Sequence, residues 1–183
     1  MKSIGALFAI GVFALVVQGA LARTIPPPWC PDLAWLVVVG IGLRWPHFLS
    51  GVVLAVTLGY GMDLLSGSLM GQHALLRLVS FLAAALAARQ LDLSGGVPVG
   101  IFVLVMTVVY GVAMVTSLSF FVGASWPGFE VVGAALAHAI VNVLAAGPMI
   151  GLVERVLARF SDEEVGRRGP MPLGFDAGRG GLL

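Results

Sequence analysis

Three side chains that can carry charge or a proton follow one another closely in an otherwise apolar region: Asp63, His73 and Arg77. A carboxylate near the end of an apolar segment is costly unless it is paired or hydrogen-bonded, so Asp63 marks either a structural lock or a site. The short break at residues 66–72 makes the flanking segments antiparallel neighbours, and we therefore expect an internal ion pair between Asp63 and Arg77. Partner binding by Asp63 and proton chemistry are the alternatives.

A second polar stripe lies near the end of the chain, where Glu130, Ala134, His138 and Asn142 recur every four residues and so share one helix face. This face should turn away from lipid, with His138 hydrogen-bonded inside a helix bundle and Asn142 bonded to another helix. Pro148 should bend the same helix. We expect the stripe to meet a milder one formed by Thr107, Tyr110, Gly111, Met114 and Ser117.

Small residues precede Asp63 at the same spacing. His47, Gly51, Ala55, Gly59 and Asp63 lie on one gently drifting helix face. Glycine and alanine let a neighbouring helix approach closely, which predicts a packing groove that ends in a buried carboxylate. The alternative is that these residues are simply common in membrane helices.

Catalytic patterns are absent from the sequence. It has no His-Glu-x-x-His, no Gly-x-Ser-x-Gly and no phosphate loop, and its one cysteine, Cys30, excludes a cysteine-based metal site. Asp63, Ser66 and His138 can be combined into a hydrolytic set only on paper, because nothing in their spacing orients a base against a nucleophile. We therefore expect no catalytic residue, no metal and no cofactor.

The elements that position these residues follow from composition. Of 183 residues, 59% are hydrophobic and 10% are charged, whereas an average soluble domain has about 25% charged residues. The formal net charge of +1 argues against nucleic acid as a partner and leaves the lipid bilayer as the natural solvent. The composition predicts an all-α membrane protein, a six-helix transmembrane bundle.

Turn-forming residues divide the apolar sequence into six segments. We expect spans near residues 3–22, 32–43, 48–65, 73–88, 98–122 and 131–157. They form one transmembrane domain over residues 1–160. Residues 161–183 contain an acidic patch, an arginine pair and a Gly/Pro-rich end, and they predict a disordered cytoplasmic tail.

Positive charge predicts the orientation. With the N-terminus inside, the outer loops carry only Arg23, and an even number of spans leaves both termini in the cytoplasm. The cytoplasmic ends then carry Lys2, Arg44, Arg89, Arg155, Arg159 and the arginines of the tail.

The first span also resembles a secretory signal peptide, because Lys2 and an apolar run precede the small residues Ala20 and Ala22. The run is long enough to span, so we expect residues 1–22 to be retained.

Several short motifs occur in an order that resembles the MreD family of rod shape-determining membrane proteins. They are Pro31-Asp32-Leu33, Gly42-Leu43-Arg44, Gly51, Gly59, Asp63-Leu64-Leu65-Ser66-Gly67, Gly71, Ala74-Leu75 and the run from Asn142 through Ala146 and Pro148 to Arg155. The resemblance covers residues 3–160. Arg77, His73 and the tail do not match the family pattern.

The resemblance implies a non-enzymatic scaffold of the cell-elongation machinery in the bacterial inner membrane. Its direct partner would be MreC, with indirect links to MreB, RodA and a class B penicillin-binding protein. Candidate partner-binding or structural residues are Asp32, Gly51, Ala55, Gly59, Asp63, Gly67, Gly71, Arg77, His138, Asn142 and Pro148. The family is similar in fold to the substrate-binding components of energy-coupling-factor vitamin transporters. That role is the alternative, and its pocket would use Trp126, Phe129 and Glu130.

Overall fold

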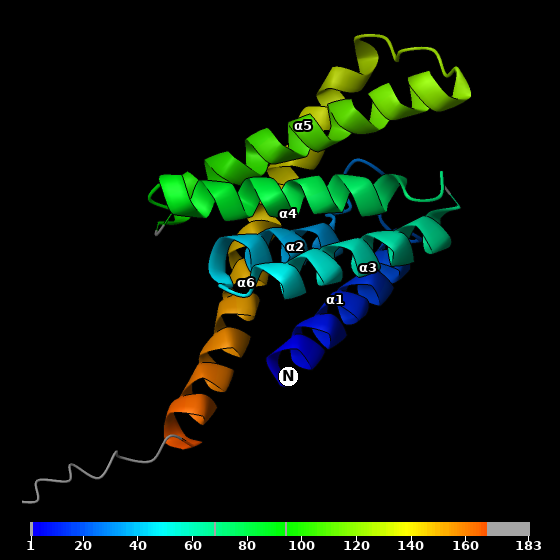
Figure 1. Ribbon diagram of the computed structural model, residues 1–183. Helices are drawn as coiled ribbons and strands as arrows, with labels where there is room; N and C mark the ends of the chain where they lie inside the picture. The colour runs from blue at the N-terminus through cyan, green and yellow to red at the C-terminus, as the bar shows by residue number, and fades with distance from the viewer. Residues whose placement is uncertain (1, 68, 94, 168–183) are drawn as a thin grey trace, which may run out of the picture.

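The computed structural model describes residues 2–67, 69–93 and 95–167, and side chains within residues 2–67, 69–93, 95–129 and 131–160. All regular structure in these ranges is helical (Figure 1). The helices are α1 (Lys2–Leu21), α2 (Leu33–Arg44), α3 (Phe48–Ser66), α4 (Gln72–Gln90), α5 (Gly96–Val122) and α6 (Glu130–Arg167). The six segments expected from the sequence are thus confirmed as helices.

The last helix is longer than predicted. The sequence predicts a span that ends near residue 157 and a tail from residue 161, and α6 continues to Arg167. The acidic and basic residues after Phe160 are ordinary helix formers and give the helix no reason to stop there. The remainder of the predicted tail, residues 168–183, lies outside the described residues.

Within the described residues, four helices are long and apolar enough to cross a membrane by length and composition: α1, α3, α5 and, within α6, Val131–Phe160. This is consistent with a helical membrane protein. The shorter helix α2 has 12 residues and rises only about 18 Å, less than the roughly 30 Å hydrocarbon core. Helix α4 is long enough, but it carries polar residues such as His73 and Arg77.

Helix α2 forms the centre of the core. Residues 34–43 are all buried, and the helix packs against α1, α3, α4 and α6. Asp32 caps its first turn. Arg44 places a positive charge in its last turn, where it interacts favourably with the negative end of the helix dipole. The sequence of α2 is continuously apolar because other helices of the chain cover it on all sides.

Glycines on α3 bring α4 into close contact. A Cβ added at Gly51 would collide with the Phe81 ring, and one at Gly59 would lie 2.7 Å from the carbonyl oxygen of His73 and still closer to the Ala74 backbone. Ala55, between them, is also buried. The predicted packing groove exists, but α4 of the same chain fills it.

Helices α5 and α6 form a hairpin whose connection lies at the upper edge of the bundle in Figure 1. Although α5 has 27 residues, only Val99, Val103 and Thr107 are buried. Near the connection the aromatic side chains are exposed, including Phe120, Trp126 and Phe129. Pro148 lies within α6, and the bend expected there stays a prediction.

Polar contacts gather at both ends of the bundle. At one end, here the arginine end, the Arg44 Nε atom lies 2.7 Å from Glu154 Oε1, and another guanidinium nitrogen of Arg44 donates to the Leu93 carbonyl at 2.9 Å. At the other end, here the cavity end, the beginning of α2 meets polar side chains of α1, α4 and α6. This second cluster contains most of the residues singled out by sequence.

Candidate functional site: a polar cavity at one end of the bundle

Asp32 organises the cavity end. Its Oδ1 atom accepts a hydrogen bond from the Trp35 backbone amide at 2.9 Å, which caps α2. Its own backbone amide donates to Asn142 Oδ1 at 2.9 Å. The same Oδ1 atom faces Arg77 at 3.0 Å. One residue thus ties the start of α2 to α4 and α6.

Arg77 is fully buried, and its ion pair is with Asp32. A second guanidinium nitrogen donates to the Leu58 carbonyl at 3.0 Å. The predicted pair between Asp63 and Arg77 was therefore wrong. A guanidinium cannot lose its charge inside a bundle, so it needs the carboxylate that tertiary packing brings to it, and Asp32 of the central helix is that carboxylate.

Asp63 instead holds the start of α4. Its carboxylate oxygens accept from the backbone amides of Gly71, His73 and Ala74 at 3.0, 2.8 and 3.2 Å. These amides have no partner within the helix, so the carboxylate satisfies them across the α3–α4 turn. Gly67, with φ 64°, and Gly71, with φ 88°, adopt the left-handed backbone that the turn requires. Asp63 is thus a structural lock, as one of the sequence interpretations had it.

His138 and Asn142 form a hydrogen-bonded pair on α6. A backbone carbonyl can only accept, so His138 Nδ1 donates to Pro28 at 3.2 Å and Nε2 accepts from Asn142 Nδ2 at 3.2 Å. Asn142 Nδ2 also lies 3.4 Å from Thr107 Oγ1 on α5. The predicted hydrogen-bonded histidine and the interhelical bond of Asn142 are confirmed. Both ring nitrogens of His138 are engaged in these contacts.

Between these groups lies a cavity of about 250 Å³. It is lined by Gln18, Cys30, Asp32, Trp35, His73, Thr107, Tyr110, Gly111, Met114, His138 and Asn142. Trp126 and Phe129, the residues expected to form an outward pocket, are instead exposed and line none of it. Their contribution to an outward pocket stays a prediction. The side chain of Glu130 lies outside the described residues.

Sequence reasoning missed Gln18. It is 9% exposed, and its Oε1 atom accepts from the Ala34 backbone amide at 3.2 Å. The sequence did offer one indication, because Gln18 is the sole polar side chain of α1 after Ser3. A lone amide inside an apolar span is costly without partners and indicates an inward face.

Aromatic rings form one wall. The Tyr110 hydroxyl lies 2.7 Å from His73 Nδ1, and the two rings stack with centroids 6.2 Å apart. Trp35 meets Tyr110 edge to face at 5.9 Å, and its indole nitrogen donates to Ser80 at 3.0 Å. These contacts fix the ring orientations, so the wall is preorganised.

Cys30, in the connection between α1 and α2, is half-buried at the cavity. Burial, and to a lesser degree the negative charge of Asp32, raise the pKa of this thiol above its ordinary value. The thiol is therefore less reactive than a free cysteine at neutral pH, because the thiolate is the nucleophile.

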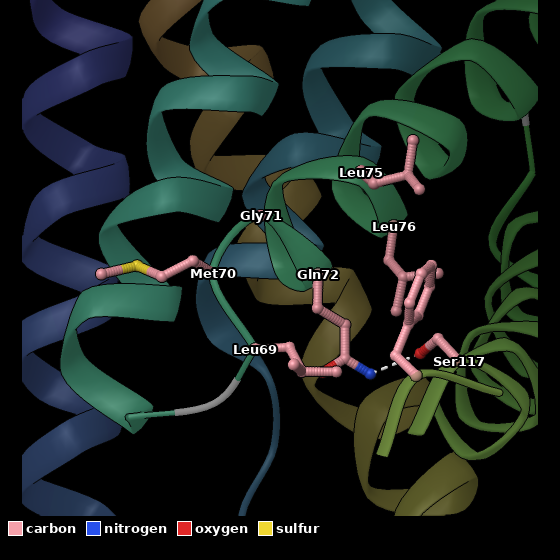
Figure 2. Close-up of a pocket in the computed structure, with 8 residues that line it drawn as sticks. Leu69, Met70, Gly71, Gln72, Leu75, Leu76 and Ser117 are labelled. Atoms are coloured by element: carbon pink, nitrogen blue, oxygen red, sulfur yellow. Dashed lines mark hydrogen bonds between the residues drawn. The ribbon is translucent and has the colours of Figure 1, made fainter. Parts of the chain in front are cut away.

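A second hollow of about 280 Å³ lies between the α3–α4 turn and α5 (Figure 2). Its walls are mainly apolar, including Leu75, Leu76 and Phe121. Figure 2 shows Gln72 reaching Ser117, a hydrogen bond of 2.5 Å. The amide nitrogen of Gln72 also donates to the Met114 carbonyl at 3.1 Å. This contact ties α4 to α5 and does not extend the polar cavity.

Among the described residues, no three His, Cys, Asp or Glu side chains are grouped so that they could hold a metal ion. No protein-family model, no curated protein and no solved structure matches the chain. Function is therefore inferred from the geometry of the molecule and from the resemblance of its motifs.

Proposed function

We propose that this chain is a non-enzymatic MreD-type scaffold of the bacterial cell-elongation machinery. It would sit in the inner membrane as a six-span bundle with both termini in the cytoplasm. Its direct partner would be the transmembrane helix of MreC, which links it to MreB, RodA and a class B penicillin-binding protein. The ordered motifs support the family, and the surface of α6 supports the mode of docking.

The observation that carries the proposal is an open small-residue face on α6. Gly147 and Gly151 lie four residues apart, and a Cβ added at either would meet nothing within 4 Å. Leu144, one turn before them, is 73% exposed. A small-xxx-small face of this kind lets a second helix approach closely in a bilayer. The corresponding face of α3 cannot serve, because α4 already covers Gly51 and Gly59.

The distribution of side chains on α4 supports six spans. Its polar residues up to Ser80 are buried, among them Gln72, His73 and Arg77, and Arg89 and Gln90 are exposed only at its last turn. Before this last turn, the large exposed side chains are apolar: Leu75, Val79, Leu82 and Leu86. Polar groups inside and apolar groups outside are expected of a helix surrounded by lipid, since lipid cannot satisfy a polar group.

The test is co-purification of MreC with a Gly147→Leu/Gly151→Leu variant from crosslinked membranes. The added side chains occupy the space that the partner helix needs, so we expect the variant to insert and fold but to lose MreC. Gly5→Leu, at another open glycine on α1, is the matched control and should retain it. Wild-type recovery of MreC by the double variant would refute docking on this face.

A vitamin-transporter component is the second candidate, and the polar cavity favours it. Substrate sites are usually concave, with a few convergent polar groups among apolar and aromatic ones. The cavity has this character, although its 250 Å³ is below the usual range of about 300–1,000 Å³. Thermal stabilisation with a vitamin panel tests this role, and the absence of any stabilisation would eliminate it.

A further inference from the structure

Two planar groups at the cavity each use only one of their two polar atoms. Gln18 Oε1 accepts from the Ala34 amide, and Asp32 Oδ1 accepts from the Trp35 amide and binds Arg77. A backbone N–H requires an acceptor, so the amide oxygen of Gln18 must face Ala34 and its NH₂ group must face away. Within the described part of the chain, Gln18 Nε2 and Asp32 Oδ2 have no hydrogen-bond partner.

The two side chains meet at the start of α2. Their sister oxygens accept from the consecutive backbone amides of residues 34 and 35, which brings the Gln18 amide and the Asp32 carboxylate to the same end of that helix. Both residues line the cavity, and Gln18 is more than nine-tenths buried. The Gln18 NH₂ nitrogen is not one of the fully buried unpaired atoms, so a molecule in the cavity can reach it. This edge of the cavity can therefore bind a ligand that carries an acceptor for the NH₂ group beside a donor for the carboxylate.

The remaining lining limits what fits. The stacked rings of His73 and Tyr110 and the edge of Trp35 offer a flat, apolar surface. Asn142 and His138 already use their side-chain polar atoms in hydrogen bonds to each other and to Asp32, Thr107 and Pro28, so they contribute little to ligand binding. Arg77 already neutralises Asp32, so the cavity has no excess charge to attract an ion.

The geometry points to a binding site for a compact, uncharged planar ring that carries a hydrogen-bond acceptor next to an N–H donor, as in aminopyrimidines and cyclic amides. The acceptor takes the Gln18 Nε2 proton, the N–H group donates to Asp32 Oδ2, and the ring lies against the aromatic wall. This site depends on the cavity and is independent of a partner on α6.

The single cysteine provides a direct assay, because Cys30 lines the cavity. The full chain in lipid nanodiscs is labelled with a maleimide, and the rate is followed by mass spectrometry. Cytosine is the probe, and unsubstituted pyrimidine is the matched ring without the donor–acceptor edge. For a ligand of about eight non-hydrogen atoms with millimolar affinity, about 10 mM cytosine should slow labelling roughly threefold or more.

Two variants make the test specific. Gln18→Glu keeps an oxygen for the Ala34 amide but removes the NH₂ donor, so the ratio of rates with and without cytosine should return to one. In Cys30→Ser/Ser125→Cys, the thiol is moved to an exposed loop position, and cytosine should have no effect. If Gln18→Glu does not fold, thermal unfolding of the wild type with cytosine and with pyrimidine supplies the comparison.

Protection by cytosine but not by pyrimidine supports the site. No protection by cytosine, or equal protection by both compounds, would overturn it. The Gly147→Leu/Gly151→Leu variant should keep full protection, so failure of MreC docking and failure of this site are distinguishable.

Discussion

The ion pair between Asp32 and Arg77 predicts an unequal response to removal of each partner. Asp32→Asn keeps an Oδ1 atom for the Trp35 amide and for Arg77, but it leaves a fully buried guanidinium with neutral acceptors only, this oxygen and the Leu58 carbonyl. Arg77→Met leaves a carboxylate whose side chain is 15% exposed at the cavity and still accepts from Trp35. A carboxylate can also take up a proton, whereas a guanidinium stays charged.

Breaking a buried pair by removing one partner costs about 3–5 kcal/mol, and we expect Asp32→Asn to fall in that range. Arg77→Met should cost less, about 1–3 kcal/mol, because the remaining group keeps a hydrogen bond and some access to water. Asp32→Asn/Arg77→Met should cost less than the sum of the single variants, with a coupling of about 1–3 kcal/mol.

The assay is reversible unfolding in mixed micelles of increasing denaturing detergent, followed by tryptophan fluorescence. The exposed pair at the arginine end is the control: Glu154→Gln should change stability by at most about 1 kcal/mol, since its side chain is 48% exposed. If Arg77→Met proved as destabilising as Asp32→Asn, or if the two substitutions were additive, the ion pair would not stabilise the cavity end as argued.

Three further outcomes are expected. Asp63→Ala should lower the free energy of unfolding by about 2–4 kcal/mol, because three backbone amides lose their acceptor, and detergent titration measures this; a loss below about 1 kcal/mol would contradict the capping role. In the same titration, Gly59→Leu should lower the free energy of unfolding by more than about 3 kcal/mol, because the new side chain overpacks against α4, whereas Gly147→Leu should be nearly neutral. Equal effects of the two substitutions would be inconsistent with the assigned packing. Near neutral pH, maleimide should label Cys30 more slowly than the cysteine of a Cys30→Ser/Ser125→Cys variant, because the raised pKa of Cys30 leaves less thiolate. The difference between the two labelling rates should narrow as the pH rises and the Cys30 thiolate forms, and equal rates at every pH would contradict this.

The helices were predictable because their signals are local. The apolar runs and turn residues gave all six segments, and the starts and ends in the structure lie within a few residues of those expected up to α6. Spacing along one helix also held: His138 and Asn142 do share a face and do bond to each other. The end of α6 was missed because no residue near Phe160 stops a helix.

The partners of the polar side chains were not predictable to the same degree. Asp63 and Arg77 are close in sequence, which made them the natural pair, whereas Asp32 and Arg77 are separated by 45 residues. Only the placement of α2 between α4 and α6 brings Asp32 to the guanidinium. The same holds for the small-residue face of α3, since sequence shows that a helix can approach Gly51 and Gly59 but does not say which helix.

The central helix α2 has a consequence for how the protein is made. Its 12 residues are too short to be held across a bilayer alone, and its buried surface is complete only when α1, α3, α4 and α6 surround it. During synthesis, stable integration of α2 must therefore wait for helices that emerge later, the last of them α6. Truncation before α6 should leave α2 exposed to quality-control proteases, so this chain reaches its final topology only after nearly all of it has left the ribosome.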